Sequence, residues 1–282
     1  MAKTGEGIGA GLPEDAILEA LVREVRDFVC RHGQGLALVG ISGGVDSALV
    51  TALAVEALGA EQVLGVLMPS PYTSRLSLDA AAALAENLGI KTLSIPIEPV
   101  MLAFSSSLAQ AFAGKEANVA EDNLQARIRG TILMSLSNKF GHLVLNTGNK
   151  SEGSVGYCTL YGDSCGALAV IGDLYKREVY AVCRRLNERK GGSHIPEIIL
   201  TRAPSAELYP GQKDEDALPP YPVLDPLLYA HLELGLDEAG LVVAGYDPAL
   251  VSRVLEMIRA SEFKRRQSPP SPGIRGVIPA WT

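Results

Sequence analysis

One hexapeptide constrains this chain more than any other segment, and it reads Ser42-Gly43-Gly44-Val45-Asp46-Ser47. An apolar run at residues 36–41 precedes it and a helical pattern follows it, so the order predicts a strand, a glycine turn and a helix N-terminus. Free backbone N–H groups and the helix dipole make such an N-terminus suitable for a phosphate or pyrophosphate. The glycines permit positive φ, the serine hydroxyls donate hydrogen bonds, and Asp46 is a ligand for a divalent cation on the phosphates.

This hexapeptide is not the Walker loop, because no Gly-Lys-Ser/Thr follows it. A simpler interpretation stays open when only these six residues are considered. In that interpretation the two glycines form an ordinary turn, and Asp46 and Ser47 only cap the helix.

The composition excludes several classes of function. The net charge of −7 argues against a general nucleic-acid binder, since such proteins are usually basic. No stretch approaches about 18 continuous apolar residues, and residues 1–13 lack the apolar segment of a signal peptide, so we expect no membrane span and a cytoplasmic protein. The cysteines show no CxxC spacing, which disfavours zinc and indicates free thiols in a reducing compartment. They are Cys30, Cys158, Cys165 and Cys183.

Apolar runs alternate with helical patterns along most of the chain, which predicts an α/β fold with a parallel sheet flanked by helices. The predicted strands lie at residues 36–41, 63–68, 91–97, 143–145 and 168–171. The predicted helices begin near Pro13 and then lie at about 47–58, 77–88, 98–113, 120–140 and 173–187, and three more follow, the last at 248–266. These last three predict a C-terminal helical extension.

We expect a flexible arm at residues 1–12 and a single domain over residues 13–282. Residues 201–222 hold five prolines and a polar run, and both a plain linker and an active-site lid are compatible with them. The loops at 42–47 and 147–152 each follow a predicted strand. Ligands of parallel sheets bind beyond the carboxyl ends of the strands, so we expect both loops to contact one ligand.

Several further motifs, taken in order, make the chain resemble the NAD⁺ synthetases, a family of ATP pyrophosphatases. They are Asn123-Leu-Gln125-Ala-Arg127-Ile-Arg129, Thr147-Gly-Asn149-Lys150-Ser151-Glu152, Tyr161-Gly162-Asp163, Gly172-Asp173-Leu-Tyr-Lys176, Pro204-Ser205-Ala-Glu207, Pro210-Gly211-Gln212-Lys213-Asp214 and Phe263-Lys264-Arg265-Arg266-Gln267. The resemblance covers roughly residues 14–275. It implies a Rossmann-like fold of the adenine nucleotide alpha hydrolase type.

The resemblance also implies a reaction. Nicotinic acid adenine dinucleotide (deamido-NAD⁺) is adenylated by ATP on its nicotinate carboxylate, and pyrophosphate leaves. Ammonia then attacks the acyl adenylate, which yields NAD⁺ and AMP in the final step of NAD⁺ biosynthesis. A carboxylate is a poor electrophile, and the mixed anhydride supplies the leaving group that it lacks. Catalysis of this kind is mostly positioning and charge neutralisation, with Mg²⁺ contributing.

Site residues are carried over from the family position by position. The residues predicted to bind ATP are Gly40, Ile41, Ser42, Gly43, Gly44, Val45, Asp46, Ser47, Thr147, Lys176 and Ser205. Those predicted to bind the dinucleotide are Asn123, Arg127, Glu152 and Lys264. Asp46 and Glu152 match the family's Mg²⁺ ligands, and Asp46 and Lys176 match catalytic positions. Arg129 is expected to point elsewhere than Arg127 and to be structural.

Local features place the chain nearer to the synthetase domain of glutamine-dependent enzymes. Leu160 and Ala167 stand where ammonia-dependent enzymes commonly carry a lysine and an acid. No amidase domain is expected, because the synthetase pattern starts within about 35 residues of Met1. We therefore expect free ammonia as the nitrogen donor, or ammonia delivered by a separate glutamine amidase subunit. The resemblance further implies a homodimer.

Two other interpretations remain open. The chain resembles other ATP pyrophosphatases, such as GMP synthetase-like or asparagine synthetase-like enzymes, in the first loop, but these do not predict Asn123, Glu152 and Lys264 together. A nucleotide-binding regulatory protein that has lost turnover is the other alternative. Saturating ATP binding without pyrophosphate release would favour it.

Overall fold

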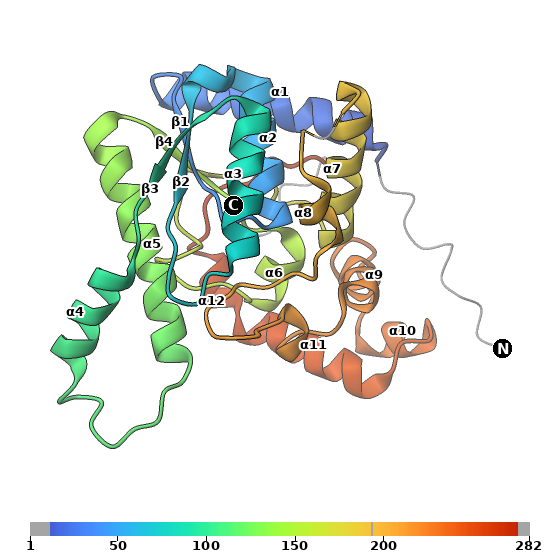
Figure 1. Ribbon diagram of the computed structural model, residues 1–282. Helices are drawn as coiled ribbons and strands as arrows, with labels where there is room; N and C mark the ends of the chain where they lie inside the picture. The colour runs from blue at the N-terminus through green and yellow to red at the C-terminus, as the bar shows by residue number, and fades with distance from the viewer. Residues whose placement is uncertain (1–11, 193, 276–282) are drawn as a thin grey trace.

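The computed structural model describes residues 12–192 and 194–275 (Figure 1), so the arm expected at residues 1–12 lies outside the described part except for Leu12. Within that part five strands form one parallel sheet in the order β3-β2-β1-β4-β5. The strands are β1 (Ala37–Gly40), β2 (Val63–Leu67), β3 (Lys91–Ser94), β4 (Leu143–Asn146) and β5 (Leu168–Ala169). The predicted α/β fold with a parallel sheet is confirmed.

Helices connect and cover these strands. They are α1 (Glu14–His32), α2 (Val45–Leu58), α3 (Arg75–Leu88), α4 (Glu98–Leu108), α5 (Val119–Phe140), α6 (Lys150–Val155), α7 (Lys176–Lys190), α8 (Glu197–Thr201), α9 (Tyr221–Leu232), α10 (Glu238–Val243), α11 (Pro248–Ala260) and α12 (Glu262–Arg265), with short 3₁₀ turns η1 (Ala60–Gln62) and η2 (Asp214–Asp216). Among the described residues, none of these helices is both long enough and apolar enough to cross a bilayer.

The strand order reverses between β1 and β4. The chain runs outward from β1 through β2 to β3, and then returns to pair β4 with the other side of β1. A crevice opens at such a reversal beyond the carboxyl ends of the two strands, where doubly wound sheets bind ligands. The segments after β1 and β4 therefore lie at the same edge of the sheet, as the sequence predicts.

The sheet is buried on both faces, which explains why its central strands are continuous apolar runs. Ala37 and Val39 of β1 are fully buried in a core formed mainly with α1, α2 and α7. Leu38 points to the opposite face, where it packs with Val66 and with Leu133 of α5. This alternation follows from the two-residue period of a strand.

The C-terminal helices form a second apolar cluster, which confirms the predicted helical extension. Leu224 and Leu228 of α9 are fully buried there with Val251 of α11. Figure 1 shows α9, α10 and α11 together at the lower right. Val155 of α6 and Tyr175 beside α7 belong to the same cluster. The extension therefore packs directly on the two helices that follow β4 and β5, and it helps to set their positions.

Three predicted boundaries were wrong. Residues 147–152 were expected to be a loop, but the Asn149 side chain accepts a hydrogen bond from the Glu152 N–H and starts α6 at Lys150. The helix expected at 173–187 begins at Lys176, because Asp173 is buried against Lys150 instead of capping a helix. The helix expected at 248–266 is divided at Ser261 into α11 and α12.

Candidate active site

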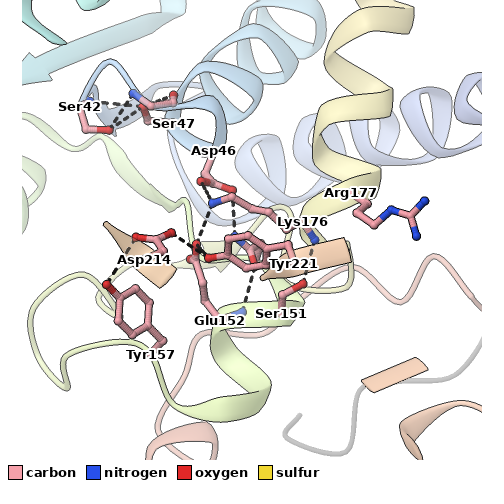
Figure 2. A network of polar contacts seen from close by, with 12 residues as sticks. Ser42, Asp46, Ser47, Ser151, Glu152, Tyr157, Lys176, Arg177, Asp214 and Tyr221 are labelled. Carbon is pink, nitrogen blue, oxygen red and sulfur yellow. Dashed lines mark hydrogen bonds and ion pairs between the residues drawn. The ribbon is translucent and has the colours of Figure 1, made fainter. Parts of the chain in front are cut away.

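The turn between β1 and α2 is held by its own serine side chains. The backbone N–H of Gly44 donates to Ser42 Oγ at 3.2 Å, and the N–H of Ser42 donates to Ser47 Oγ at 3.3 Å (Figure 2). Gly43 has φ +82°, and a Cβ atom there would lie 2.3 Å from the carbonyl oxygen of Ser77. Only glycine fits at this position, so the turn that the hexapeptide predicts is formed and is locked against α3.

Lys176 joins the first loop to the second. Its side chain is 2% exposed, and its Nζ donates to Asp46 Oδ2 at 2.7 Å and to Glu152 Oε1 at 2.8 Å (Figure 2). The three residues come from α2, α6 and α7, which all begin at the same edge of the sheet. The structure thus brings together the two predicted metal ligands and the predicted catalytic lysine.

The ionisation of this cluster is set by burial and by the mutual attraction of its charges. Burial opposes the charge of Lys176, but Asp46 and Glu152 outweigh it and raise the lysine pKa well above its usual value. Burial raises the pKa of Glu152 to about 7, and the ammonium of Lys176 offsets only part of that effect. The lysine is therefore an obligate cation.

Asn149 links Asp46 to the backbone of Glu152, and sequence reasoning assigned it no role. Its Nδ2 donates to Asp46 Oδ1 at 2.9 Å, while its Oδ1 accepts from the N–H of Glu152 at 3.0 Å. One amide side chain therefore positions the carboxylate of Asp46 and also caps the helix that carries Glu152. The only sequence signal for this role was an Asn at an N-cap spacing, three residues before Glu152.

A third carboxylate reaches the cluster from the segment between α8 and α9. Asp214 Oδ2 accepts from the hydroxyl of Tyr221 at 2.8 Å, and its Oδ1 accepts from Tyr157 at 3.4 Å (Figure 2). The same Tyr221 hydroxyl lies 3.3 Å from Glu152 Oε1. Burial raises the pKa of Asp214. Residues 201–222, which the sequence left as a linker or a lid, thus contact the centre of the site.

The donor set suits Mg²⁺ bound together with phosphates. Magnesium prefers oxygen ligands and usually takes one or two carboxylates, with water and substrate phosphates completing its shell. Asp46 and Glu152 supply two carboxylates beside the serine-lined turn. Among residues 12–192 and 194–275, no group of three His, Cys, Asp or Glu side chains forms a metal site by itself. The residues therefore fit a cation that arrives with a nucleotide better than a permanently bound metal.

One large cavity lies over this cluster. It is lined by residues 40–42 and 44–47, by Thr147 and by Ser205, together with Asp46, Glu152 and Lys176. The side chain of Ser205 donates to the carbonyl oxygen of Gln212 at 2.6 Å. The positions predicted to bind ATP thus border one cavity, apart from Gly43, whose place is inside the turn.

Three of the residues predicted to bind the dinucleotide do not line this cavity. Asn123 Oδ1 accepts from Thr159 Oγ1 at 2.6 Å, and Lys264 Nζ donates to the carbonyl oxygens of Gly156 and Cys158, each at 2.8 Å. Arg127 is exposed and borders a separate apolar groove formed by α4 and α5. Of the predicted dinucleotide contacts, only Glu152 lines the main cavity.

Arg129 faces the main cavity, so the expectation that it is structural missed a candidate site residue. Its Nε donates to the carbonyl oxygen of Met68 at 3.1 Å, and no other hydrogen bond of its guanidinium is formed within the described residues. Burial lowers the pKa of Arg129 to about 10, which still leaves it charged at neutral pH. A cavity wall with a charged, sparsely bonded guanidinium suits an anionic or hydrogen-bond-accepting ligand.

Comparison with known proteins places this geometry in a family. The profile of the NAD synthase family matches residues 17–268. A glutamine-dependent NAD(+) synthetase from Thermotoga maritima is 51% identical over 255 residues, which are 90% of this chain and 44% of the relative. The chain therefore spans about half the length of the curated relatives it matches.

Solved structures agree with this assignment. The glutamine-dependent NAD⁺ synthetase from Acinetobacter baumannii, in complex with ADP, is 40% identical with a TM-score of 0.67, covering 99% of this chain and 52% of that one. The NH3-dependent NAD synthetase from Campylobacter jejuni is 28% identical with a TM-score of 0.72, covering 90% of this chain and 96% of that one. The motifs, the fold and these matches together show that the chain belongs to the NAD synthase family.

Proposed function

We propose that this chain catalyses the ATP-dependent amidation of deamido-NAD⁺ to NAD⁺ through an acyl adenylate. The observation that carries the proposal is the meeting of Asp46, Glu152 and Lys176 at one edge of the sheet, beside the serine-lined turn. A buried cation flanked by carboxylates beside free helix N–H groups suits the triphosphate of ATP. The ADP complex of the related synthetase from A. baumannii supports a nucleotide in this fold.

In the first step an oxygen of the nicotinate carboxylate attacks the α-phosphorus of ATP. The bond from that phosphorus to the β-bridging oxygen breaks, and pyrophosphate leaves. The turn at residues 42–47 and Lys176 hold the phosphate charge, so the anionic carboxylate approaches a neutralised centre. Mg²⁺, held by Asp46 and Glu152, would supply further neutralisation of the phosphates.

In the second step the nitrogen of ammonia attacks the carbonyl carbon of the adenylate. AMP leaves with the oxygen that joined carbon to phosphorus, and the nitrogen loses one proton as the amide forms. We propose free ammonia as the donor, with ammonia from a separate glutamine amidase as the alternative. The relatives include proteins named for each donor, so the donor is decided by experiment.

The deciding assay measures pyrophosphate release and NAD⁺ formation with ATP, Mg²⁺ and deamido-NAD⁺, in parallel with ammonium or glutamine. Turnover with ammonium alone is the expected result. Pyrophosphate release without NAD⁺ formation from either donor would indicate that an amidase partner is missing. No pyrophosphate release at all would contradict the proposed reaction.

We also propose that the chain acts as a homodimer through the face formed by α4 and α5. Phe104 and Phe140 are 44% and 54% exposed there, and both line the groove that contains Arg127. A second copy that covers this face would bury the apolar side chains and enclose Arg127 beside a bound dinucleotide. Light scattering should report a dimer, and a fully active monomer would contradict this proposal.

A further inference from the structure

Glu207 ties the segment between α8 and α9 to the start of α3. Its Oε1 accepts from Ser74 Oγ at 2.7 Å, and its Oε2 accepts from Ser77 Oγ at 2.8 Å. Arg202 completes the contact, with Nη2 donating to Glu207 Oε1 at 2.9 Å and Nη1 donating to Ser77 Oγ at 2.6 Å. In Figure 1 this segment runs past the lower end of α3. We call these four side chains the α3 clasp.

The backbone of Glu207 is strained where it forms the clasp. Glu207 has φ +48°, in the left-handed region that residues other than glycine rarely adopt. Such a conformation persists only when surrounding contacts favour it. The side chains of Arg202 and Glu207 are 17% and 20% exposed, so the charged contact is largely shielded from water. An exposed ion pair contributes too little free energy to offset backbone strain, so the shielded contacts of Glu207 are needed to explain its conformation.

The clasp connects two walls of the main cavity. On one side, the carbonyl oxygen of Ser77 packs against Gly43 in the phosphate-binding turn. On the other side, the N–H of Glu207 donates to Ser205 Oγ at 3.1 Å, and Ser205 borders the cavity. A displacement of Glu207 would therefore move the wall that carries Ser205 away from the turn.

The far end of the same segment is held at the lysine cluster. Asp214 accepts hydrogen bonds from Tyr221 and Tyr157, and its N–H donates to the carbonyl oxygen of Pro204 at 3.3 Å. Residues 202–214 are thus fixed at both ends across the cavity. Between these two points the chain has no regular structure, and it exposes Pro210 and Gly211.

We propose that Glu207 is a positioning residue whose clasp to Ser74, Ser77 and Arg202 holds residues 202–214 closed over the bound nucleotide. The proposal rests on the proposed function, since the closed segment would keep water away from the acyl adenylate while ammonia reacts. Opening of the clasp would let the nucleotide enter and AMP leave. Glu207 acts through Ser205 and the segment, and it is not assigned a contact with the reacting atoms.

Two substitutions separate the side chain from the backbone. Glu207→Gly removes the clasp but adopts positive φ without strain, whereas Glu207→Gln keeps the shape and removes the charge. Glu215→Gln is the matched control, because Glu215 lies exposed in the same segment and forms no hydrogen bond or ion pair in the described part of the chain. Thermal unfolding of each variant checks that the fold is retained.

Trypsin provides a readout that does not depend on turnover, because Lys213 is exposed within the segment. We expect Glu207→Gly to raise the rate of cleavage after Lys213 about tenfold, Glu207→Gln to raise it less, and Glu215→Gln to leave it unchanged. A non-hydrolysable ATP analogue should protect the wild type more strongly than Glu207→Gly. Equal cleavage of the wild type and Glu207→Gly would overturn the clasp even if the proposed reaction were wrong.

The catalytic readout is the ratio of pyrophosphate released to NAD⁺ formed at limiting ammonium. It should stay near one in the wild type and in Glu215→Gln. Glu207→Gly should raise the KM for ATP about tenfold and increase the ratio, because water then competes for the adenylate. If Glu207→Gly has the same KM for ATP and the same ratio of pyrophosphate to NAD⁺ as the wild type, the clasp is not needed for turnover and the proposal is wrong. A wild type without pyrophosphate release would refute the proposed function and leave the trypsin result to decide the clasp.

Discussion

The Nζ atom of Lys176 lies 2.7 Å from Oδ2 of Asp46, although 130 residues separate the two in the chain. This contact joins the start of α7 to the start of α2. Glu152 accepts from the same Nζ, so one buried ammonium compensates two carboxylates. The arrangement fixes both carboxylates and one ammonium beside the serine-lined turn, and most of the expected chemistry follows from it.

Replacing Asp46 with Asn should lower the turnover number at least about a hundredfold, since the carboxylate that holds Lys176 and would hold Mg²⁺ beside the reacting phosphates is lost. The Asn side chain keeps the size of the carboxylate, so the fold should persist. Pyrophosphate release at saturating ATP and deamido-NAD⁺ measures the effect. Asp79→Asn, in an exposed pair with Arg75, is the control and should remain near wild type. Comparable activity of the two variants would show that Asp46 does not contribute to catalysis.

Replacing Gly43 with Ala should cost far more stability than the same change at Gly35. Both have positive φ, but nothing lies within 4 Å of a Cβ at Gly35, whereas a Cβ at Gly43 meets the carbonyl oxygen of Ser77 at 2.3 Å. We expect a loss of about 1 kcal/mol for Gly35→Ala and about 3 kcal/mol for Gly43→Ala in the free energy of unfolding. Urea denaturation measures both losses. Similar losses would contradict the prediction, because they would mean that Ser77 and α3 can shift away from residue 43 at no cost in free energy.

The effect of Asp163→Asn on stability should depend on pH. Burial raises the pKa of Asp163 from 3.8 to about 6, so the folded state binds this proton more tightly than the unfolded chain. The contribution of Asp163 to the free energy of unfolding of the wild type therefore falls by about 3 kcal/mol in total as pH rises from about 4 to about 6. Asn keeps an oxygen for the Thr159 N–H and carries no charge.

Urea denaturation at several pH values tests this prediction. The free energy of unfolding of Asp163→Asn minus that of the wild type should increase between about pH 4 and pH 6 and then stay level, because only the wild type loses stability over this range. A difference that does not change with pH would show that the carboxyl group is not desolvated as the structure indicates.

Arg129→Met should reduce kcat/KM for ATP by about ten- to a hundredfold, the scale of one lost hydrogen bond to a charged group. Arg129 lines the main cavity and donates to the carbonyl oxygen of Met68, which directly follows β2. Methionine fills similar space without the charge. Arg75→Met, with an exposed side chain on α3, is the control. An unchanged kcat/KM would return Arg129 to the structural role that the sequence suggested.

Much of the fold was predictable from local pattern. The strand at residues 37–40 and the helix from Val45 were predicted to within a few residues, because an apolar run and a glycine turn restrict the backbone whatever surrounds them. Boundaries that depend on one side chain were not predictable. Asn149 starts α6 by capping it, and Asp173 starts no helix because Lys150 binds it.

The candidate site divides in the same way. Asp46, Glu152 and Lys176 could be named from the sequence because they match motif positions of the family that the chain resembles. The resemblance gave the binding role to Arg127 and left Arg129 structural, whereas the structure places Arg129 at the main cavity and Arg127 at the separate groove. Which of the two faces the cavity depends on how α5 packs against the sheet.

By itself, the sequence determined the parallel sheet, the glycine turn before α2 and the family, because these depend on short-range backbone preferences and on motif residues a few positions apart. Only the tertiary structure decided that Glu207 meets Ser74 across 133 residues, that Asn149 supports Asp46, and that Asp214 joins the lysine cluster. Those contacts join elements far apart in the chain. Their geometry follows from how helices pack on a sheet, which no local pattern encodes.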